Sequence, residues 1–171
     1  YSELYKGIRH VKAGRFKEAE ETYKKVLKKD KNNVDALRLL GMLASQNKKY
    51  AIAEKLFVRA IHLNPYFKLL WDNLAKCYRL QNKLTEAKKA FTNLLKLDPN
   101  NFEAIGASAT MSIRLGQYKE GINLYKELLK VNDNNPRVYL SMGHAYKTIG
   151  ERTNSEDSYL KAIDQFPLCG E

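Results

Sequence analysis

The pentapeptide LDPNN, residues 97 to 101, decides the fold because related turns return at one fixed interval along the chain. It places a proline where one helix must stop and two asparagines where the next helix can start. The related stretches are KDKNN from Lys29, LNPYF from Leu63, VNDNN from Val131 and QFPLC from Gln165. Each begins 34 residues after the one before it, as 63 minus 29 shows, with no insertion or deletion. Such an interval indicates an array of repeated structural units.

The five turns divide the chain into repeats of equal length. Repeats 1 to 5 span residues 1–33, 34–67, 68–101, 102–135 and 136–169, and repeat 1 lacks one leading residue. In each repeat an apolar pattern with helical spacing runs for about 13 residues, breaks at a glycine or a polar pair, and resumes for about 14. Each repeat therefore predicts a hairpin of two helices, and the chain predicts an all-α fold of about ten helices.

Small and aromatic residues stand at fixed positions of the repeat. Position 8 holds Gly7, Gly41, Ala75, Ala109 and Gly143. Position 20 holds Ala19, Ala53, Ala87, Gly121 and Ser155, and position 24 holds Tyr23, Phe57, Phe91, Tyr125 and Tyr159. Small residues at the first two positions let the two helices of a hairpin approach closely, and we expect the aromatic ring to fill the space beside them.

Repeat 3 carries the clearest signature. Its residues Trp71, Leu74, Ala75, Tyr78, Ala87, Phe91 and Pro99 stand at characteristic positions. The repeats thus resemble tetratricopeptide repeats over the whole chain. The resemblance implies a right-handed superhelical solenoid of five hairpins, in which the first helices line an inner groove, and we expect residues 1–171 to form one array with a further unit starting at residue 170. Repeats 4 and 5 depart from the pattern, and we expect looser packing there. The departing residues are Ser108, Ser112, Gly121 and Arg152.

Composition restricts the class of protein. The chain has 171 residues, of which 29% are charged and 44% hydrophobic, proportions that are ordinary for a soluble protein. No apolar run approaches the roughly 18 residues that a membrane-spanning helix needs, so we expect no membrane association. The two cysteines, Cys77 and Cys169, have no second cysteine or histidine at metal-binding spacing. Their isolation favours a reduced, cytoplasmic location and predicts no metal or cofactor.

The resemblance places one face of each first helix on the inner groove, at positions 2, 5, 9, 12 and 13 of the repeat. From this face, together with position 6 of repeat 3, we expect a peptide-binding site. Its residues are Arg38, Met42, Leu69, Asp72, Asn73, Lys76, Arg79, Gly106, Thr110, Ile113, Arg114, Arg137, Leu140, His144 and Lys147. The same positions of repeats 1 and 2 also hold Ile8, Val11, Lys12, Ser45 and Gln46. Basic residues outnumber acidic ones and apolar residues lie between them, which suits a protein or peptide partner of acidic character.

Repeat 4 suggests a sharper site within this groove. Gly106 and Thr110 thin the groove wall between Arg79 and Arg114. Arginine binds carboxylates and phosphates through two parallel hydrogen bonds, so we hypothesise a pocket there for an acidic or phosphorylated side chain. The alternative is that the small residues only permit close helix packing.

Two other classes of function fit the sequence less well. A net charge of +11 suits a polyanion such as RNA, which helical-hairpin repeats can bind. Much of that charge falls at outward positions of the second helices, as at Lys25 and Lys89, so we do not expect nucleic acid binding. His10, His62 and His144 lie in three different repeats without carboxylate or cysteine partners at productive spacing, so we expect no catalysis by this segment.

The two ends of the array differ. In repeat 1, Glu3, Lys6 and His10 stand where later repeats mostly carry apolar residues, so we expect the array to begin near residue 1. In repeat 5, Ile163 and Phe166 form an apolar edge, through which we expect molecules to self-associate.

Residues 143–171 carry a second pattern. The residues concerned are Gly143, His144, Ala145, Lys147, Thr148, Gly150, Pro167, Gly170 and Glu171. They are similar to the last repeats before the catalytic domain in bacterial proteins that fuse tetratricopeptide repeats to a sulfotransferase. This resemblance implies that the chain is the non-catalytic N-terminal part of such an enzyme and holds its protein substrate or partner. The alternative is a free-standing assembly scaffold. A phosphate-binding loop downstream of Glu171 would indicate the enzyme, and further repeats would indicate the scaffold.

Overall fold

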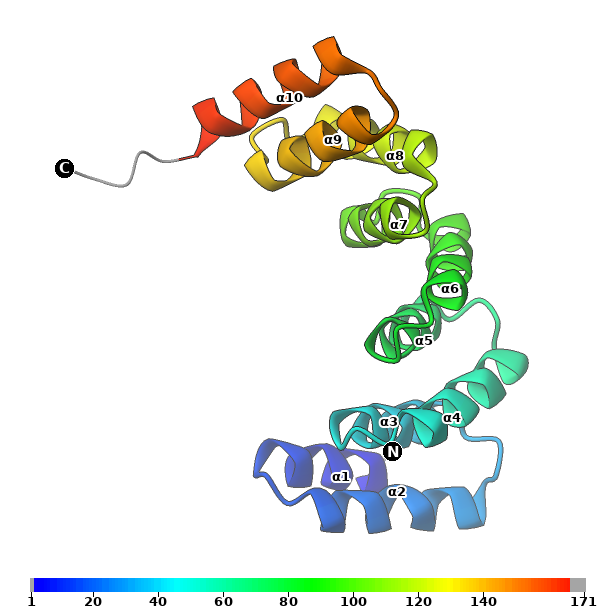
Figure 1. Ribbon diagram of the computed structural model, residues 1–171. Coiled ribbons are helices and arrows are strands. Elements are labelled where there is room, and N and C mark those ends of the chain that lie inside the picture. The colour runs from blue at the N-terminus through cyan, green and yellow to red at the C-terminus, as the bar shows by residue number, and fades with distance from the viewer. Residues whose placement is uncertain (1, 167–171) are drawn as a thin grey trace, which may run out of the picture. The chain divides into compact units, whose positions relative to one another are not determined.

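The chain is built from helices alone over the part that the structure describes. The structure, a computed structural model, describes residues 2–166, and within this range it holds ten α-helices and no strand (Figure 1). The helices are α1 (Ser2–Lys12), α2 (Phe16–Lys29), α3 (Val34–Gln46), α4 (Tyr50–Leu63), α5 (Lys68–Leu80), α6 (Leu84–Leu97), α7 (Phe102–Arg114), α8 (Tyr118–Val131), α9 (Pro136–Thr148) and α10 (Arg152–Gln165). Each repeat contributes one hairpin, so the predicted all-α fold is confirmed.

The helices fall into two units, each with its own core. The N-terminal unit, Tyr1–Asp98, holds the hairpins α1–α2, α3–α4 and α5–α6, and the C-terminal unit, Pro99–Glu171, holds α7–α8 and α9–α10. The two helices of each hairpin lie side by side (Figure 1). Successive hairpins within a unit also pack together, α2 on α3 and α4 on α5 in the first unit and α8 on α9 in the second. One continuous array over residues 1–171 stays a prediction.

The recurring asparagines cap first helices. The side-chain oxygen of Asn33 accepts a hydrogen bond from the backbone N–H of Ala36 at 2.9 Å, and that of Asn101 accepts one from Ala104 at 3.0 Å. Asn135 caps α9 in the same way. Each bond satisfies one of the backbone donors that the start of a helix leaves without an intrahelical partner. The role that the sequence predicts for these asparagines is confirmed.

The turn inside each hairpin contains one residue in the left-handed backbone region. Gly14, Gly116 and Gly150 adopt φ angles of 72°, 77° and 82°, which glycine tolerates without strain. Lys48 (φ 60°) and Asn82 (φ 59°) take the same place in repeats 2 and 3. A lysine in this conformation costs roughly 1–2 kcal/mol, because its Cβ approaches the backbone. The breaks that the apolar pattern predicts are confirmed as these turns.

Glycines of first helices lie against aromatic rings of second helices. A Cβ atom built on Gly41 would lie 2.7 Å from Cε1 of Phe57, and one on Gly143 would lie 2.8 Å from Cδ1 of Tyr159, distances that real Cβ atoms do not show. Phe57 is only 1% exposed, so its ring is enclosed by the core. In repeats 2 and 5 the glycine is therefore a packing requirement and not a break in the helix.

The expectation of looser packing in repeats 4 and 5 is wrong at Gly121 and stays a prediction at Arg152. A Cβ atom on Gly121 would lie 2.6 Å from Cδ1 of Ile113, so α7 and α8 approach closely there. Arg152 is exposed, and it lines a hollow of about 630 Å³ near the start of α10. Repeats 1 to 4 carry half-buried apolar or aromatic residues at the same position, namely Phe16, Tyr50, Leu84 and Tyr118.

We expect Gly41→Ala to destabilise the protein. Alanine favours a helix by about 1 kcal/mol over glycine, but overpacking of an enclosed ring costs about 1–3 kcal/mol. The free energy of unfolding should therefore fall by up to about 2 kcal/mol in a urea titration followed by circular dichroism. Gly106→Ala is the matched control, because the atom nearest to the new Cβ would be Cδ2 of Leu128 at 3.6 Å. This variant should be at least as stable as the wild type. Equal loss in both variants would contradict the packing role of Gly41.

Candidate functional site

An apolar hollow lies in the N-terminal unit, on the face formed by its first helices. Its volume is about 490 Å³, within the range of roughly 300–1,000 Å³ that is typical of ligand pockets. Side chains of α1, α3 and α5 line it together with one ring each from α2 and α4. The lining residues are Ile8, Val11, Lys12, Tyr23, Leu39, Met42, Leu43, Ser45, Gln46, Phe57, Asn73 and Lys76.

The contacts between glycines and rings explain how two core residues come to line the hollow. Tyr23 and Phe57 are each 1% exposed and stand on second helices. Because Gly7 and Gly41 lack a Cβ atom, the two rings lie directly against the backbone of α1 and α3. This part of the hollow therefore belongs to the packed core of the unit, which gives it a fixed shape.

Arg38 of α3 stands beside the hollow with one donor unused. Its Nη1 lies 3.2 Å from Sδ of Met42, and its guanidinium carbon lies 5.6 Å from the centre of the Phe67 ring. Its Nε is buried and has no hydrogen-bond partner among the described residues. Burial raises the pKa of Tyr23, and the positive charge of Arg38 partly opposes this rise, so the charge acts close to the lining of the hollow.

Asn73 of α5 offers the complementary group. It lines the hollow, and its side-chain oxygen is buried without a hydrogen-bond partner in the part of the chain that the structure describes. Leaving such an oxygen unpaired costs roughly 1–3 kcal/mol. A donor on Arg38 and an acceptor on Asn73 are thus both unused on α3 and α5, which contact each other. Native proteins leave few buried polar groups in this state, and a bound ligand is one way to satisfy them.

The charged groups that line the hollow are positive. Lys12 at the end of α1 and Lys76 on α5 belong to its lining, whereas no Asp or Glu does so among residues 2–166. Nζ of Lys76 lies 2.9 Å from Oδ2 of Asp72, one turn earlier on α5. This ion pair positions the ammonium group of Lys76 and partly neutralises its charge.

A second ion pair joins the hairpins of repeats 2 and 3. Nζ of Lys83 and Nε2 of Gln81 donate hydrogen bonds to Oε2 of Glu54 at 2.8 and 3.2 Å. Burial raises the pKa of Glu54, but these hydrogen bonds and the charge of Lys83 outweigh it, so the pKa lies below its ordinary value of 4.5. Glu54 is therefore ionised at neutral pH and holds the hairpin that carries Asn73 and Lys76 against its neighbour.

The structure brings part of the predicted site together. The predicted residues that line the hollow are Met42, Asn73 and Lys76. Arg38 and Asp72 contact two of these residues directly. Leu69 and Arg79 are exposed and lie outside the lining. The predicted groove residues Ile8, Val11, Lys12, Ser45 and Gln46 also line the hollow.

Sequence reasoning missed four residues of the hollow. They are Tyr23, Leu39, Leu43 and Phe57. The repeat pattern assigns both rings to the core, and the structure shows that they serve the core and the hollow at once. Glycine at position 8 of repeats 1 and 2 is the signal from which the two rings could have been predicted in the lining. Because glycine has no Cβ atom, a ring from the second helix can pass beside the backbone of the first helix at that position.

In the C-terminal unit, Thr110 and Ile113 take part in helix packing. Oγ1 of Thr110 donates to the backbone oxygen of Gly106 at 2.9 Å and lies 3.0 Å from the hydroxyl of Tyr125. Ile113 is half-buried and packs over Gly121. The contact of Thr110 with Tyr125 fits the alternative that this residue serves helix packing, whereas Gly106 has space for a Cβ atom. Arg79 and Arg114 belong to different units, and a pocket between them stays a prediction.

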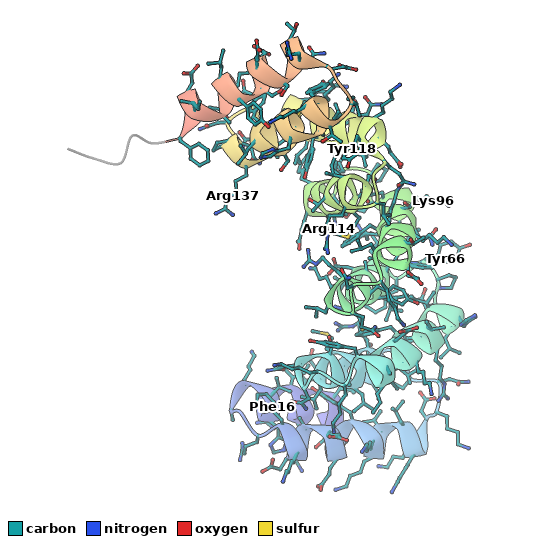
Figure 2. All side chains as sticks on the ribbon, in the orientation of Figure 1. Phe16, Tyr66, Lys96, Arg114, Tyr118 and Arg137 are labelled. Carbon is teal, nitrogen blue, oxygen red and sulfur yellow. The ribbon has the colours of Figure 1, made fainter. Side chains whose placement is uncertain are left out.

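The remaining predicted residues of the C-terminal unit are exposed. They are Arg114, Arg137, Leu140, His144 and Lys147. Figure 2 shows the side chain of Arg137 pointing away from α9. Nδ1 of His144 and the hydroxyl of Tyr159 are hydrogen-bonded at 2.9 Å, and the two rings meet edge to face. This contact ties His144 to α10.

The described residues show no arrangement for metal binding or for crossing a membrane. Within residues 2–166, no three His, Cys, Asp or Glu side chains come together as metal ligands would. No helix in that range combines the length and apolar character that a membrane span requires. Cys77 is buried, and burial raises the pKa of its thiol, which disfavours the reactive thiolate. Cys169 lies outside the described residues.

Models of the tetratricopeptide repeat match residues 5–66, 40–102, 78–145 and 136–167 of the sequence. The chain belongs to the tetratricopeptide repeat family. These overlapping matches extend over all five hairpins, which agrees with the regular recurrence of glycine, aromatic residue and asparagine cap along the chain.

Relatives of known sequence are longer proteins. The tetratricopeptide repeat-containing protein trd-1 of Caenorhabditis elegans is 29% identical over 157 residues, which cover 91% of this chain and 20% of that protein. RNA polymerase II-associated protein 3 of Homo sapiens is 32% identical over 99 residues, which cover 58% of this chain and 15% of that protein. The chain thus spans a fifth or less of the length of these two relatives.

Solved structures share the fold at low sequence identity. MamA superposes with a TM-score of 0.87 at 22% identity, covering 99% of this chain and 96% of that one. YrrB, described as a TPR protein with an unusual peptide-binding site, superposes with a TM-score of 0.88 at 17% identity, covering 96% and 85%. These likenesses show that the fold is that of a tetratricopeptide repeat solenoid.

We expect Asn73→Leu to stabilise the protein, because leucine has a similar size and removes the unpaired oxygen. The free energy of unfolding should rise by about 1 kcal/mol. Asn101→Leu is the matched control: its oxygen caps α7, and losing the cap should lower the free energy of unfolding by about 1 kcal/mol. Urea titrations of the two variants should therefore shift in opposite directions. A loss of stability in Asn73→Leu would mean that Asn73 serves the fold.

Proposed function

We propose that the chain is a non-catalytic module that binds a protein or peptide segment of acidic character through the face of its first helices. One observation carries the proposal: an apolar hollow whose lining includes an unused acceptor on Asn73, while Arg38, which contacts Met42 of the lining, holds an unused donor. Every residue of a peptide offers a backbone N–H and a backbone C=O, so one peptide segment can satisfy both groups. Lys12 of the lining favours a carboxylate on that segment.

The fold and the relatives support this proposal in a general way. Solenoids of helical hairpins present extended surfaces to their partners. The peptide-binding site of YrrB is a property of that protein, but it occurs on the same fold. The C-terminal unit carries exposed Arg137 and Lys147 on α9, and we propose that this helix also binds an acidic segment.

Selection from a displayed library of random peptides tests the proposal. Peptides enriched on the immobilised chain should contain more Asp and Glu than the starting library, and their affinity should be measured by fluorescence anisotropy. Met42→Glu introduces a charge into the apolar lining and should weaken binding at least tenfold, or about 1.4 kcal/mol. Ile52→Glu is the matched control, because Ile52 is 53% exposed on α4 and lies outside the lining.

Two outcomes would overturn peptide binding in the hollow. The first is a selection without enrichment, and the second is equal binding by the wild type and Met42→Glu. RNA binding is the alternative that the net charge of +11 supports. It would be favoured if single-stranded RNA bound the chain with an affinity that falls steeply as salt rises.

We further propose that α10 supports self-association. Leu160 and Ile163 are 61% and 66% exposed on this helix, and Phe166, the residue that follows it, is 46% exposed. Ile61 stands at the position of Ile163 three repeats earlier and is only 8% exposed, on a helix that packs against the next hairpin. A second copy of the chain can cover the same apolar face on α10.

Sedimentation equilibrium of the purified chain measures this association. The apparent mass should rise with concentration, and Ile163→Asp should abolish the rise. Ile52→Asp places the same charge on an exposed isoleucine of α4 and should leave the association unchanged. A wild type that stays monomeric at all concentrations would contradict a role of α10 in self-association.

The nature of the whole protein is a separate proposal. The resemblance of residues 143–171 to the repeats that precede a sulfotransferase domain supports a role in holding the protein substrate or partner of such an enzyme, and Pro167, Gly170 and Glu171 of that pattern lie outside the described residues. A cytoplasmic location fits the composition. The sequence that follows Glu171 in the whole protein decides between the enzyme and a free-standing scaffold.

A further inference from the structure

The hollow of the N-terminal unit combines a largely apolar lining with one unpaired hydrogen-bond acceptor. Seven of the twelve residues that line it are aliphatic, aromatic or methionine, and the rings of Tyr23 and Phe57 belong to these seven. Oδ1 of Asn73, which also lines the hollow, is buried and has no hydrogen-bond partner within residues 2–166. A ligand group that fills the hollow is therefore bulky and apolar, and it gains most if it also donates one hydrogen bond.

The repeat does not require a polar side chain at this place. Asn73 occupies position 6 of repeat 3, whereas Leu39 occupies position 6 of repeat 2 and lines the same hollow. An aliphatic side chain thus fits this position. A buried amide oxygen without a partner lowers stability, whereas the oxygen of Asn101 raises it by capping α7. Recognition of a ligand accounts for an oxygen on Asn73 that packing does not explain.

The charges of the lining restrict which donors can enter. Lys12 and Lys76 line the hollow, and no Asp or Glu of residues 2–166 does so. A Lys or Arg side chain of a ligand would therefore lose its water without gaining a carboxylate. Side chains such as Ser, Asn and Gln carry donors but bury little apolar surface. The aromatic side chains that carry a donor, Trp and Tyr, remain.

An indole suits the hollow better than a phenol. The indole N–H is a donor and the ring has no acceptor, so one hydrogen bond to Asn73 satisfies it completely. A phenol hydroxyl can donate in the same way, but its oxygen then also needs a donor once it is buried. Aromatic rings pack well edge to face against other rings and beside a methionine sulfur. Tyr23, Phe57 and Met42 line the hollow, and its volume of about 490 Å³ is that of pockets which hold ligands larger than one indole.

We propose that the hollow binds a tryptophan side chain of the peptide segment and that Asn73 recognises its indole N–H. The inference rests on the proposed function and names the residue of the ligand that the hollow selects. The indole ring buries its apolar surface against Tyr23, Phe57 and Met42, which provides most of the affinity. The hydrogen bond from the indole N–H to Oδ1 of Asn73 provides the preference for tryptophan over phenylalanine, because phenylalanine leaves this oxygen unpaired.

The library selection described above gives the first test. Peptides enriched on the immobilised chain should contain tryptophan more often than the starting library does. In the enriched peptide of highest affinity, the tryptophan is then replaced by phenylalanine or by 3-benzothienylalanine, in which a sulfur atom takes the place of the indole N–H. Each replacement should weaken binding about tenfold in fluorescence anisotropy. The loss should be the same at high salt, because it does not depend on exposed charges.

Protein variants assign the indole N–H to Asn73. Asn73→Leu should weaken the tryptophan peptide about tenfold but bind the 3-benzothienylalanine peptide at least as well as the wild type does, so that the preference disappears. Asn32→Leu is the matched control, because Asn32 is exposed and lies outside the lining, and it should keep the preference. Met42→Glu should weaken both peptides, because it changes the apolar lining. Circular dichroism should show that each variant keeps its helices.

The results separate this inference from the proposed function. If selected peptides bind in a way that Met42→Glu weakens but contain no excess of tryptophan, tryptophan recognition is overturned and peptide binding stands. The same holds if 3-benzothienylalanine replaces tryptophan without loss of affinity. If Asn73→Leu keeps the preference of the wild type, recognition by Asn73 is overturned. If the selection enriches no peptide, both the inference and the proposed function fail.

Discussion

The contact between a helix backbone and an aromatic ring governs both the packing of a hairpin and the shape of the candidate site. In repeat 2, the ring of Phe57 occupies the volume that a Cβ atom on Gly41 would take. The contact lets α3 and α4 approach closely, encloses the ring, and at the same time brings the ring to the lining of the hollow. Tyr23 and Gly7 do the same in repeat 1. The fold and the binding surface therefore share atoms, and a change in either partner of the contact alters both.

The polar atoms beside the hollow follow a different rule. Most buried polar groups in proteins are paired, yet Arg38 and Asn73 each keep one buried atom without a partner in the described part of the chain. Such atoms lower stability, whereas Asn33 and Asn101 raise it by capping helices with the same side chain. Binding sites are commonly less stable than the rest of a fold for this reason. A polar group that is already hydrogen-bonded within the protein cannot form the same bond with a ligand.

The fold could be predicted from the 34-residue period. The hollow could be predicted only in part, because it depends on side chains that differ from one repeat to the next. The turn asparagines, the inner glycines and the aromatic positions act locally, so each could be interpreted from its place in the repeat. Phe67 shows the limit of that approach, because it takes the capping position before α5 and makes no side-chain cap. The candidate site was predicted in part, through Met42, Asn73 and Lys76. Tyr23 and Phe57 were not predicted as site residues. The repeat pattern assigns each position a single role, whereas these two side chains contact the core and the hollow at once. Ile113 was expected on the groove, but Gly121 leaves space that its side chain fills.

The first and second helices of a hairpin differ in how their N-terminal ends are capped. Side chains of Asn33, Asn101 and Asn135 cap three of the first helices, whereas none of the five second helices begins with a side-chain cap. Backbone amides at the start of a second helix consequently have no side-chain acceptor, and we expect local opening to begin there. The capped first helices α3, α7 and α9 would then keep their side chains in place while a partner binds and dissociates.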